Sequence, residues 1–147
     1  MQILKLDNLY FDKIISLIRL SDSSFSWSDQ QILDSLDQYL VLGLLDQNEL
    51  KAVVIFSSIF EVAELLYICV DKFSKNQGLG YTILKESFVL LSKQNIQEVF
   101  LEVDINNHIA IKLYSKLGFK KISIRKNYYK KNNGSYSDAL IFQLKID

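Results

Sequence analysis

The sequence predicts an α/β protein of the α+β type, in which helices pack on a mixed, mostly antiparallel β-sheet. Three observations predict this class. Short β-rich segments lie on both sides of longer segments whose apolar residues recur at helical spacing. A helical segment also lies between two strand-sized ones, and such a crossover joins parallel strands. Finally, 147 residues with 49% apolar content can form one packed core but not two substantial ones, so we expect one domain over residues 1–147.

The N-terminal half is predicted to hold a strand, two helices and three further strands. In order, these are a strand at 2–5, helices at 9–20 and 28–36, and strands at 39–45, 50–60 and 63–70. The first helix is indicated by Ile14, Leu17 and Ile18, which lie on one helical face. The second opens at Ser28, because Ser28 with Gln31 three residues later is typical of a capping box. A polar turn separates the strands at 39–45 and 50–60, which therefore form a hairpin.

The C-terminal half continues with alternating helices and strands. The pattern predicts a helix at 78–95, a strand at 99–103, a helix at 107–117, and strands at 119–126 and 139–146. The first of these helices is indicated by Ile83, Leu84 and Phe88 on one face. Asn107 is placed to cap the second. The helix at 78–95 is the expected crossover between neighbouring parallel strands.

The composition excludes several classes of function. Seventeen Lys and Arg residues balance seventeen Asp and Glu, so the net charge gives no attraction to nucleic acid. One cysteine, Cys69, cannot form an internal disulfide, and with a single histidine, His108, the chain has no Cys/His cluster for zinc. The N-terminus lacks the features of a signal peptide, and no apolar run approaches the roughly 20 residues of a membrane-spanning helix. We therefore expect a cytoplasmic protein without a metal, a membrane partner or a direct nucleic-acid partner.

A glycine-containing turn is the first candidate site. The strand that ends at Val70 is followed by a polar loop and then by Gly78 and Gly80 at the start of a predicted helix. Backbone N–H groups at a helix start bind anions, and glycine lets a phosphate approach the backbone closely. The pattern is not a dinucleotide fingerprint, because Ile83 lies where the third glycine would be, and there is no Walker lysine. Alone, it indicates either an anion site or a turn that needs glycine for packing.

Three longer segments give this turn a context. They are ICVDKFSKNQGLG at 68–80, FLEVDINNHIAIKLYSKLGF at 100–119 and IRKNYY at 124–129. Together they resemble the GNAT superfamily of N-acetyltransferases and, more closely, the bacterial ribosomal-protein-alanine N-acetyltransferases. FSWSD at 25–29 resembles that family's short aromatic motif before its second helix. The resemblance covers nearly the whole chain. It implies an acyl-CoA N-acyltransferase fold, in which the sheet is splayed between two central parallel strands and helices cover both faces.

The resemblance also implies the binding site of the co-substrate, acetyl-CoA. The strand before the loop would present backbone groups to it, and Asn107 would contact it further along. Its other expected contacts are Ile68, Cys69 and Val70 on the strand, and Asn76, Gln77, Gly78, Leu79, Gly80 and Tyr81 around the pyrophosphate. This chain departs from the family pattern at Lys75, where Arg or Gln is usual, and at Asn76, where a basic residue is common. Because the loop binds largely through backbone N–H groups, we expect weaker binding here, not its loss.

Acetyl transfer to an amine needs a base for the amine and an acid for the departing thiolate, since an α-amine with a pKa of about 7.7–8.0 is largely protonated at neutral pH. By the resemblance, Glu102 is the base and Tyr114 the acid. Alternation on the strand places Glu102 on the face opposite its apolar neighbours. Without the resemblance, Glu102 would be interpreted as an exposed strand residue and Tyr114 as a core residue. Glu64, on the strand leading into the site, is either a rival base or a surface residue.

The acceptor implied by the resemblance is a protein N-terminus, namely the N-terminal alanine of small-subunit ribosomal protein number eighteen. A lysine side chain, a polyamine or another small amine is the alternative acceptor, and a non-catalytic acyl-CoA-binding module is a third hypothesis. Trp27, Tyr128 and Tyr129 either line a groove for the peptide or anchor loops. Cys69 is expected to be buried and not to carry the acyl group, and His108 to be exposed.

Overall fold

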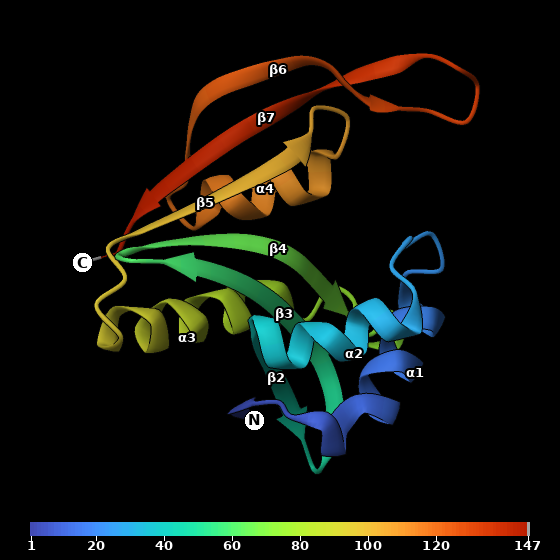
Figure 1. Ribbon diagram of the computed structural model, residues 1–147, viewed down its shortest axis with the longest axis vertical. Helices are drawn as coiled ribbons and strands as arrows, with labels where there is room; N and C mark the ends of the chain where they lie inside the picture. Colours follow the sequence, from blue (N-terminus) through green and yellow to red (C-terminus); the bar gives the residue numbers. More distant parts are fainter. Residues whose placement is uncertain (147) are drawn as a thin grey trace.

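The structure is a computed structural model that describes residues 1–146, and it contains a seven-stranded sheet (Figure 1). The strands are β1 (Gln2–Lys5), β2 (Leu40–Asp46), β3 (Glu49–Ile59), β4 (Val62–Val70), β5 (Glu98–Asp104), β6 (Lys120–Lys130) and β7 (Tyr136–Lys145). The helices are α1 (Phe11–Ser21), α2 (Asp29–Gln38), α3 (Leu79–Lys93) and α4 (His108–Lys116), with short 3-10 helices η1 (Asn8–Tyr10) and η2 (Lys72–Ser74). Apart from the two 3-10 helices, this is the predicted order of elements.

The sheet has the order β1-β2-β3-β4-β5-β7-β6, and its one parallel pair among the described strands is β4–β5. That pair is short. Val62, Ala63 and Glu64 lie opposite Glu98, Val99 and Phe100, and the two strands then separate. Figure 1 shows them close together at one end and apart at the other. The expected splay between two central parallel strands is therefore confirmed.

Helices cover both faces of the sheet, as expected. On one face, α3 and α4 pack on the sheet through buried residues such as Ile83, Leu84 and Tyr114. On the other face, α1 and α2 pack through a separate group that includes Ile14 and Ile32. The capping box at the start of α2 is confirmed, because Ser28 Oγ accepts from the Gln31 N–H while Gln31 Oε1 accepts from the Ser28 N–H. No helix within residues 1–146 is long and apolar enough to cross a membrane.

The last hairpin is longer than predicted. β6 and β7 were expected at 119–126 and 139–146, but they extend toward each other to Lys130 and Tyr136. Their register shifts between Arg125 and Tyr129, and Asn127 within this bulge has a φ of 53°. The Asn127 N–H donates to Asp138 Oδ1 on the facing strand at 2.9 Å. The hydrogen bond to Asp138 thus stabilises the bulge, and the pairing of β6 with β7 resumes after it. The local sequence pattern does not reveal this continuation.

Candidate active site

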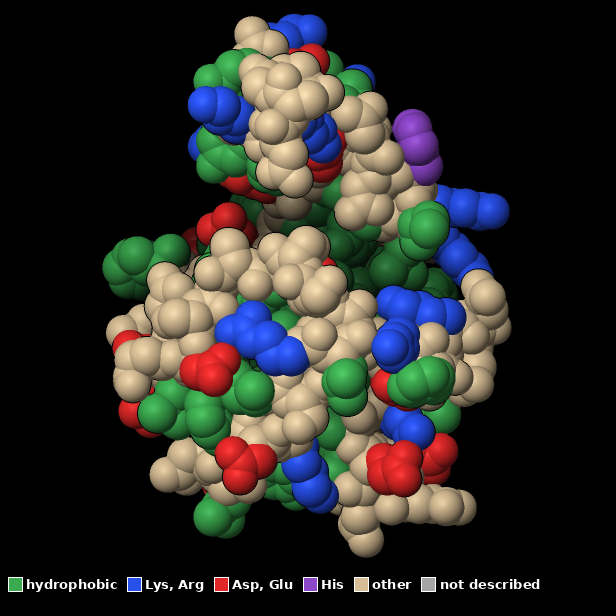
Figure 2. Space-filling view, turned by 90° about the vertical axis from the view of Figure 1, so that its right-hand side faces the viewer, with side chains coloured by type: hydrophobic (Ala, Val, Ile, Leu, Met, Phe, Trp, Pro, Cys, Tyr) green, Lys and Arg blue, Asp and Glu red, His purple; other side chains and the backbone are tan. Residues whose placement is uncertain are grey.

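A cavity of about 340 Å³ opens where β4 and β5 separate. Six residues predicted to form the site line it: Ile68, Cys69, Val70, Gly80, Asn107 and Tyr114. Its other lining residues are Ser21, Asp22, Lys75, Ile109, Ala110 and Leu113. Figure 2 shows the surface hollowed between the end that carries β6 and β7 and the rest, with hydrophobic side chains inside and basic ones on one rim. Segments about 40 residues apart in the sequence therefore meet in one cleft.

The glycine turn forms one end of this cleft. Gly78 is the N-cap of α3 and has a φ of 73°, in the left-handed region that favours glycine. Asn76 also has a positive φ, of 65°, which asparagine tolerates better than most residues. No side chain caps the helix start, so the N–H groups of its first turn lack a partner within the helix. The turn can therefore donate several backbone hydrogen bonds to an anion.

The residues that follow Gly78 differ in what they can offer. Leu79 is buried in the core, so only its backbone is available. A Cβ at Gly80 would lie 3.2 Å from Leu113 Cδ2, so Gly80 permits α3 to pack closely against α4. Two ammonium groups lie near the Tyr81 ring, with Lys116 Nζ 4.9 Å and Lys85 Nζ 5.9 Å from the ring centre. Gln77 is exposed.

Tyr114 lies deep in the cleft. Its side chain is 6% exposed and its ring packs edge-on against Phe119, with the ring centres 5.8 Å apart. Burial, and secondarily the nearby Tyr129, raises the pKa of Tyr114 to about 12. Tyr114 therefore carries its proton at neutral pH. At the mouth of the cleft, the Asn107 side chain accepts from the Ala110 N–H at 3.2 Å, so it caps α4 as predicted.

Glu102 lies on the other face of the sheet from Tyr114. The alternation on β5 is as predicted, with Val99, Leu101 and Val103 buried beneath the helices. The Glu102 side chain is 24% exposed, and its Oε1 lies 3.2 Å from Arg125 Nη1. It lines a second cavity, of about 490 Å³. The strand thus presents a partly buried, paired carboxylate and not a fully exposed one.

Tyr129 lies near both candidate catalytic residues. Its pKa is raised to about 12, first by burial and then by the nearby Glu102 carboxylate. The same tyrosine contributes to the raised pKa of Tyr114. Tyr129 packs against Tyr128, with ring centres 5.1 Å apart, and the Arg125 guanidinium lies 5.2 Å from the Tyr128 ring centre. Two of the three aromatic residues predicted near the acceptor, Tyr128 and Tyr129, are therefore beside Glu102 and its ion pair.

The family is settled by comparison with known proteins. The sequence profile described as the Acetyltransferase (GNAT) family matches residues 4–119. The chain belongs to the GNAT family of acetyltransferases. It is 34% identical over 124 residues to the ribosomal protein bS18-alanine N-acetyltransferase of Escherichia coli K12, covering 84% of this chain and 83% of the relative. The enzyme of the same name from Haemophilus ducreyi is 34% identical over 119 residues, which is 80% of this chain and 82% of the relative.

A solved structure agrees with the sequence matches. The crystal structure of the ribosomal-protein-S18-alanine N-acetyltransferase from Escherichia coli superimposes with a TM-score of 0.90 at 30% identity. The match covers 99% of this chain and 94% of the other. The chain is thus an acetyl-CoA-dependent N-acetyltransferase with the predicted fold.

One predicted residue of this GNAT enzyme lies apart from the others. Trp27 lines a small cavity beside α2 and packs against Phe25, with ring centres 5.3 Å apart. Phe25 in turn stacks on Tyr67 of β4 at 3.8 Å. Arg19 ties this segment down by donating to the carbonyls of Phe25 and Trp27. Trp27 therefore lines a different cavity from those that hold Glu102 and Tyr114, and it anchors a segment that packs against β4.

Two contacts of the site were missed by the sequence analysis. Arg125 was within a quoted motif but was not expected to pair with Glu102, because β7 lies between their strands in the sheet. Asp22 accepts from the Tyr67 hydroxyl at 2.7 Å, a contact across 45 residues that no local pattern indicates. Lys75, noted only as a departure from the motif, lines the cleft.

The alternatives raised by the sequence also have places in the structure. Cys69 is 5% exposed, packs with the α1 and α2 layer, and has its thiol pKa raised by burial, as expected for an inert residue. His108 is exposed, as predicted. Glu64 is exposed but lines the same cavity as Glu102. Among residues 1–146 no group of three or more His, Cys, Asp and Glu is arranged to hold a metal ion.

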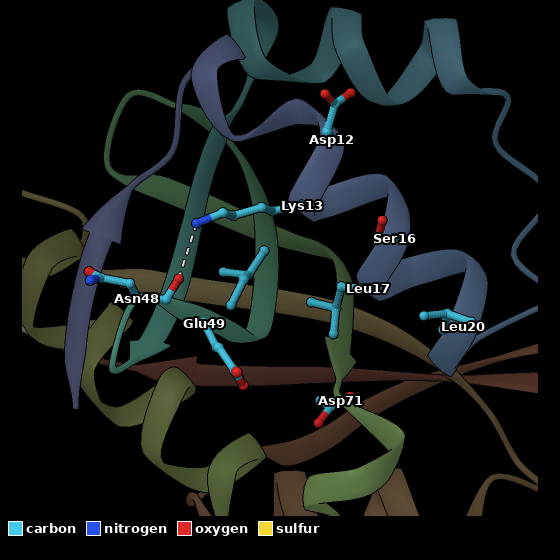
Figure 3. Close-up of a pocket in the computed structure, with 9 residues that line it drawn as sticks. Asp12, Lys13, Ser16, Leu17, Leu20, Asn48, Glu49 and Asp71 are labelled. Carbon is cyan, nitrogen blue, oxygen red and sulfur yellow. Dashed lines mark hydrogen bonds between the residues drawn. The ribbon is translucent and has the colours of Figure 1, made fainter.

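A larger cavity, of about 600 Å³, lies between α1 and the β2–β3 turn (Figure 3). Lys13 crosses it and donates to the Asn48 carbonyl at 3.1 Å. Asp12, Glu49 and Asp71 also line it. It contains none of the residues predicted for the site. The largest of these cavities is therefore not the one that contains the predicted site residues.

Proposed function

We propose that this enzyme transfers the acetyl group of acetyl-CoA to the α-amine of a protein N-terminus, with the N-terminal alanine of ribosomal protein bS18 as its acceptor. Relatives from two bacteria named for that reaction match about four fifths of the chain. The observation that carries the proposal is the pair of cavities at the divergence of β4 and β5. One contains a protonated tyrosine and the other a carboxylate, on opposite faces of the sheet.

Acetyl-CoA would occupy the cleft that holds Tyr114. The backbone N–H groups at the start of α3 favour a pyrophosphate there, with Lys75 adding positive charge. Past Glu64, β4 has no partner strand on its β5 side. The backbone groups of Ile68, Cys69 and Val70 are therefore available to the pantetheine arm, because unpaired backbone groups need partners. Asn107 would contact the same arm with its amide N–H groups.

The acceptor amine would enter from the cavity that holds Glu102. Glu102 takes a proton from the ammonium, directly or through a water, and the neutral amine attacks the thioester carbon. The tetrahedral intermediate then loses the CoA thiolate as the C–S bond breaks, and Tyr114 gives that sulfur its proton. The attacking nitrogen gives up its second proton to solvent, and both Glu102 and Tyr114 regain their starting protonation by exchange with solvent. The raised pKa of Tyr114 supports this role, since the group is still protonated at neutral pH. Tyr128 and Tyr129, beside Glu102, would contact the peptide, and Trp27 would act by anchoring the segment before α2.

The test is acetyl-CoA turnover with a peptide that carries the N-terminus of bS18, followed by thiol release and intact mass. We expect a gain of one acetyl group on the free peptide and none on an N-terminally blocked copy. Turnover of a lysine side chain or a polyamine, with none on peptide N-termini, would contradict the proposed acceptor. Acetyl-CoA binding without transfer to any amine would favour the non-catalytic module instead.

The catalytic assignment has its own control on the same strand. Glu102→Gln should lower kcat by about a hundredfold or more, while the Kd for acetyl-CoA stays within a factor of two or so. Glu98→Gln is the matched variant, because Glu98 lies on the same face of β5 but away from the point where β4 and β5 separate. Its Oε1 accepts a hydrogen bond from Gln143 Nε2 at 3.0 Å. It should keep its activity. Equal turnover in the two variants would remove Glu102 from the mechanism.

A further inference from the structure

The cavity that holds Glu102 is larger than a single amine requires. Its volume is about 490 Å³, within the range of cavities that bind small ligands. Its lining comes from the five strands β3 to β7 and includes Val62, Glu64, Phe100, Glu102, Arg125 and Ile141. There is therefore space beside the reacting amine for another part of the acceptor.

The charges in this cavity do not balance. It is lined by two carboxylates and one cation, and Arg125 pairs with Glu102 at 3.2 Å. Glu64 makes no ion pair or side-chain hydrogen bond within residues 1–146. The neighbouring cations Lys126 and Lys131 are paired elsewhere, with Asp138 and Asp104. One negative charge at the rim of the cavity is thus left for a ligand.

The rest of the lining suits a long cationic side chain. Lys and Arg place their methylene stems on apolar surface and keep the charged end near a partner or water. Val62, Phe100 and Ile141 supply such a surface, and Glu64 is exposed at its edge. Consecutive residues of an extended peptide are about 3.3–3.6 Å apart. A residue next to the acetylated one can therefore reach Glu64 while the amine lies at Glu102.

We propose that Glu64 is a specificity residue that favours acceptor N-termini with Lys or Arg as the second residue. The inference rests on the proposed function, since it concerns the peptide whose α-amine is acetylated. It also separates the two interpretations of Glu64 in the sequence. A base acts on every acceptor alike, whereas a charge subsite distinguishes acceptors by the charge of one side chain.

The test compares three peptides that begin with alanine and differ only at residue two, which is Lys, Gln or Glu. Wild-type kcat/KM should be highest for Lys and lowest for Glu, with about a fivefold difference between Lys and Gln, as a partly exposed ion pair gives. Glu64→Gln should remove the preference for Lys over Gln, and Glu64→Lys should reverse the order of the Lys and Glu peptides. The preference should shrink as salt is raised, because exposed charges are screened.

Glu61→Gln is the matched control, since Glu61 is exposed in the adjacent β3–β4 turn but does not line the cavity. It should keep the wild-type preference. Equal acetylation of the three peptides by the wild type would overturn the inference and leave the proposed function intact. An equal loss of kcat on all peptides in Glu64→Gln would overturn it in favour of a base. Failure of the wild type on every peptide N-terminus would reject both proposals.

Discussion

Gly78→Ala tests whether the start of α3 binds the pyrophosphate of acetyl-CoA. Gly78 has a φ of 73°, and a Cβ built there meets nothing within 4 Å. A non-glycine residue in this left-handed conformation destabilises the folded state by about 1–2 kcal/mol. Alanine also lowers the conformational entropy of the unfolded chain, which stabilises the protein by about 0.4–1 kcal/mol. The net loss of stability should be about 1 kcal/mol. For a chain of this size that lowers Tm by about 2–4 °C.

Binding should suffer more than stability. If the strain turns one backbone N–H away from the phosphate, the loss is about 1.5–3 kcal/mol for a hydrogen bond to a charged group, or roughly a tenfold to hundredfold rise in Kd. Isothermal calorimetry with acetyl-CoA measures this directly. Thermal unfolding gives a second measure, because ligand at 100 times its Kd should stabilise the wild type by about 2.7 kcal/mol and the variant by clearly less.

Gly134→Ala is the control for strain alone. Gly134 has a φ of 86° in the β6–β7 loop, and a Cβ there also meets nothing within 4 Å. Its Tm should fall by a similar amount while the Kd for acetyl-CoA is unchanged. The reasoning is refuted if Gly78→Ala binds acetyl-CoA as tightly as the wild type, or if both variants lose affinity equally.

Three further predictions concern the acceptor side and the buried acid. Tyr114→Phe should lower kcat by about a hundredfold with little change in acetyl-CoA affinity. Because burial raises the pKa of Tyr114 to about 12, the unfolded chain ionises first, so the free energy of unfolding should fall from about pH 10 to about pH 12, less steeply in the Phe variant by urea titration. Arg125→Ala, which removes the cation 3.2 Å from Glu102, should lower kcat/KM for the peptide about tenfold, and Arg125→Lys should lower it less. Asp138→Ala should raise the peptide KM without changing acetyl-CoA affinity, because it removes the acceptor that holds the bulge at Asn127. Asp138→Asn keeps an acceptor oxygen and should therefore have a peptide KM close to that of the wild type.

Much of the fold could be predicted from local patterns. Apolar periodicity located α1 and α3, and the cap residues Ser28 and Asn107 located the starts of α2 and α4, because these signals depend on residues one or two turns apart. The ends of β6 and β7 were wrong for the opposite reason. The Asn127 bulge is held by Asp138, which is eleven residues away on the facing strand. The alternating strand pattern ends at this bulge, although the pairing of β6 with β7 continues beyond it.

The candidate site divides in the same way. The family motifs predicted the cleft that contains Ile68, Gly80 and Tyr114, because each motif fixes its own strand end or helix start. They did not predict how Glu102 is paired. That contact depends on β7 lying between β5 and β6 and on the register of all three strands. The sequence of a single strand does not determine that register.

The short pairing of β4 with β5 has a mechanical consequence. Only three residue pairs within residues 1–146 join the part of the sheet made of β1 to β4 to the part made of β5, β7 and β6. The strands within each part are paired over much longer stretches. Such a seam is the most compliant line across the sheet, so a load between the two parts would open it before either part deformed. The width of the opening is then set largely by the side chains packed around α3 and α4. Amide hydrogen exchange at Ala63 and Val99 would report how often the β4–β5 pairing opens. A ligand that contacts both strands should slow this exchange by holding them at a fixed separation.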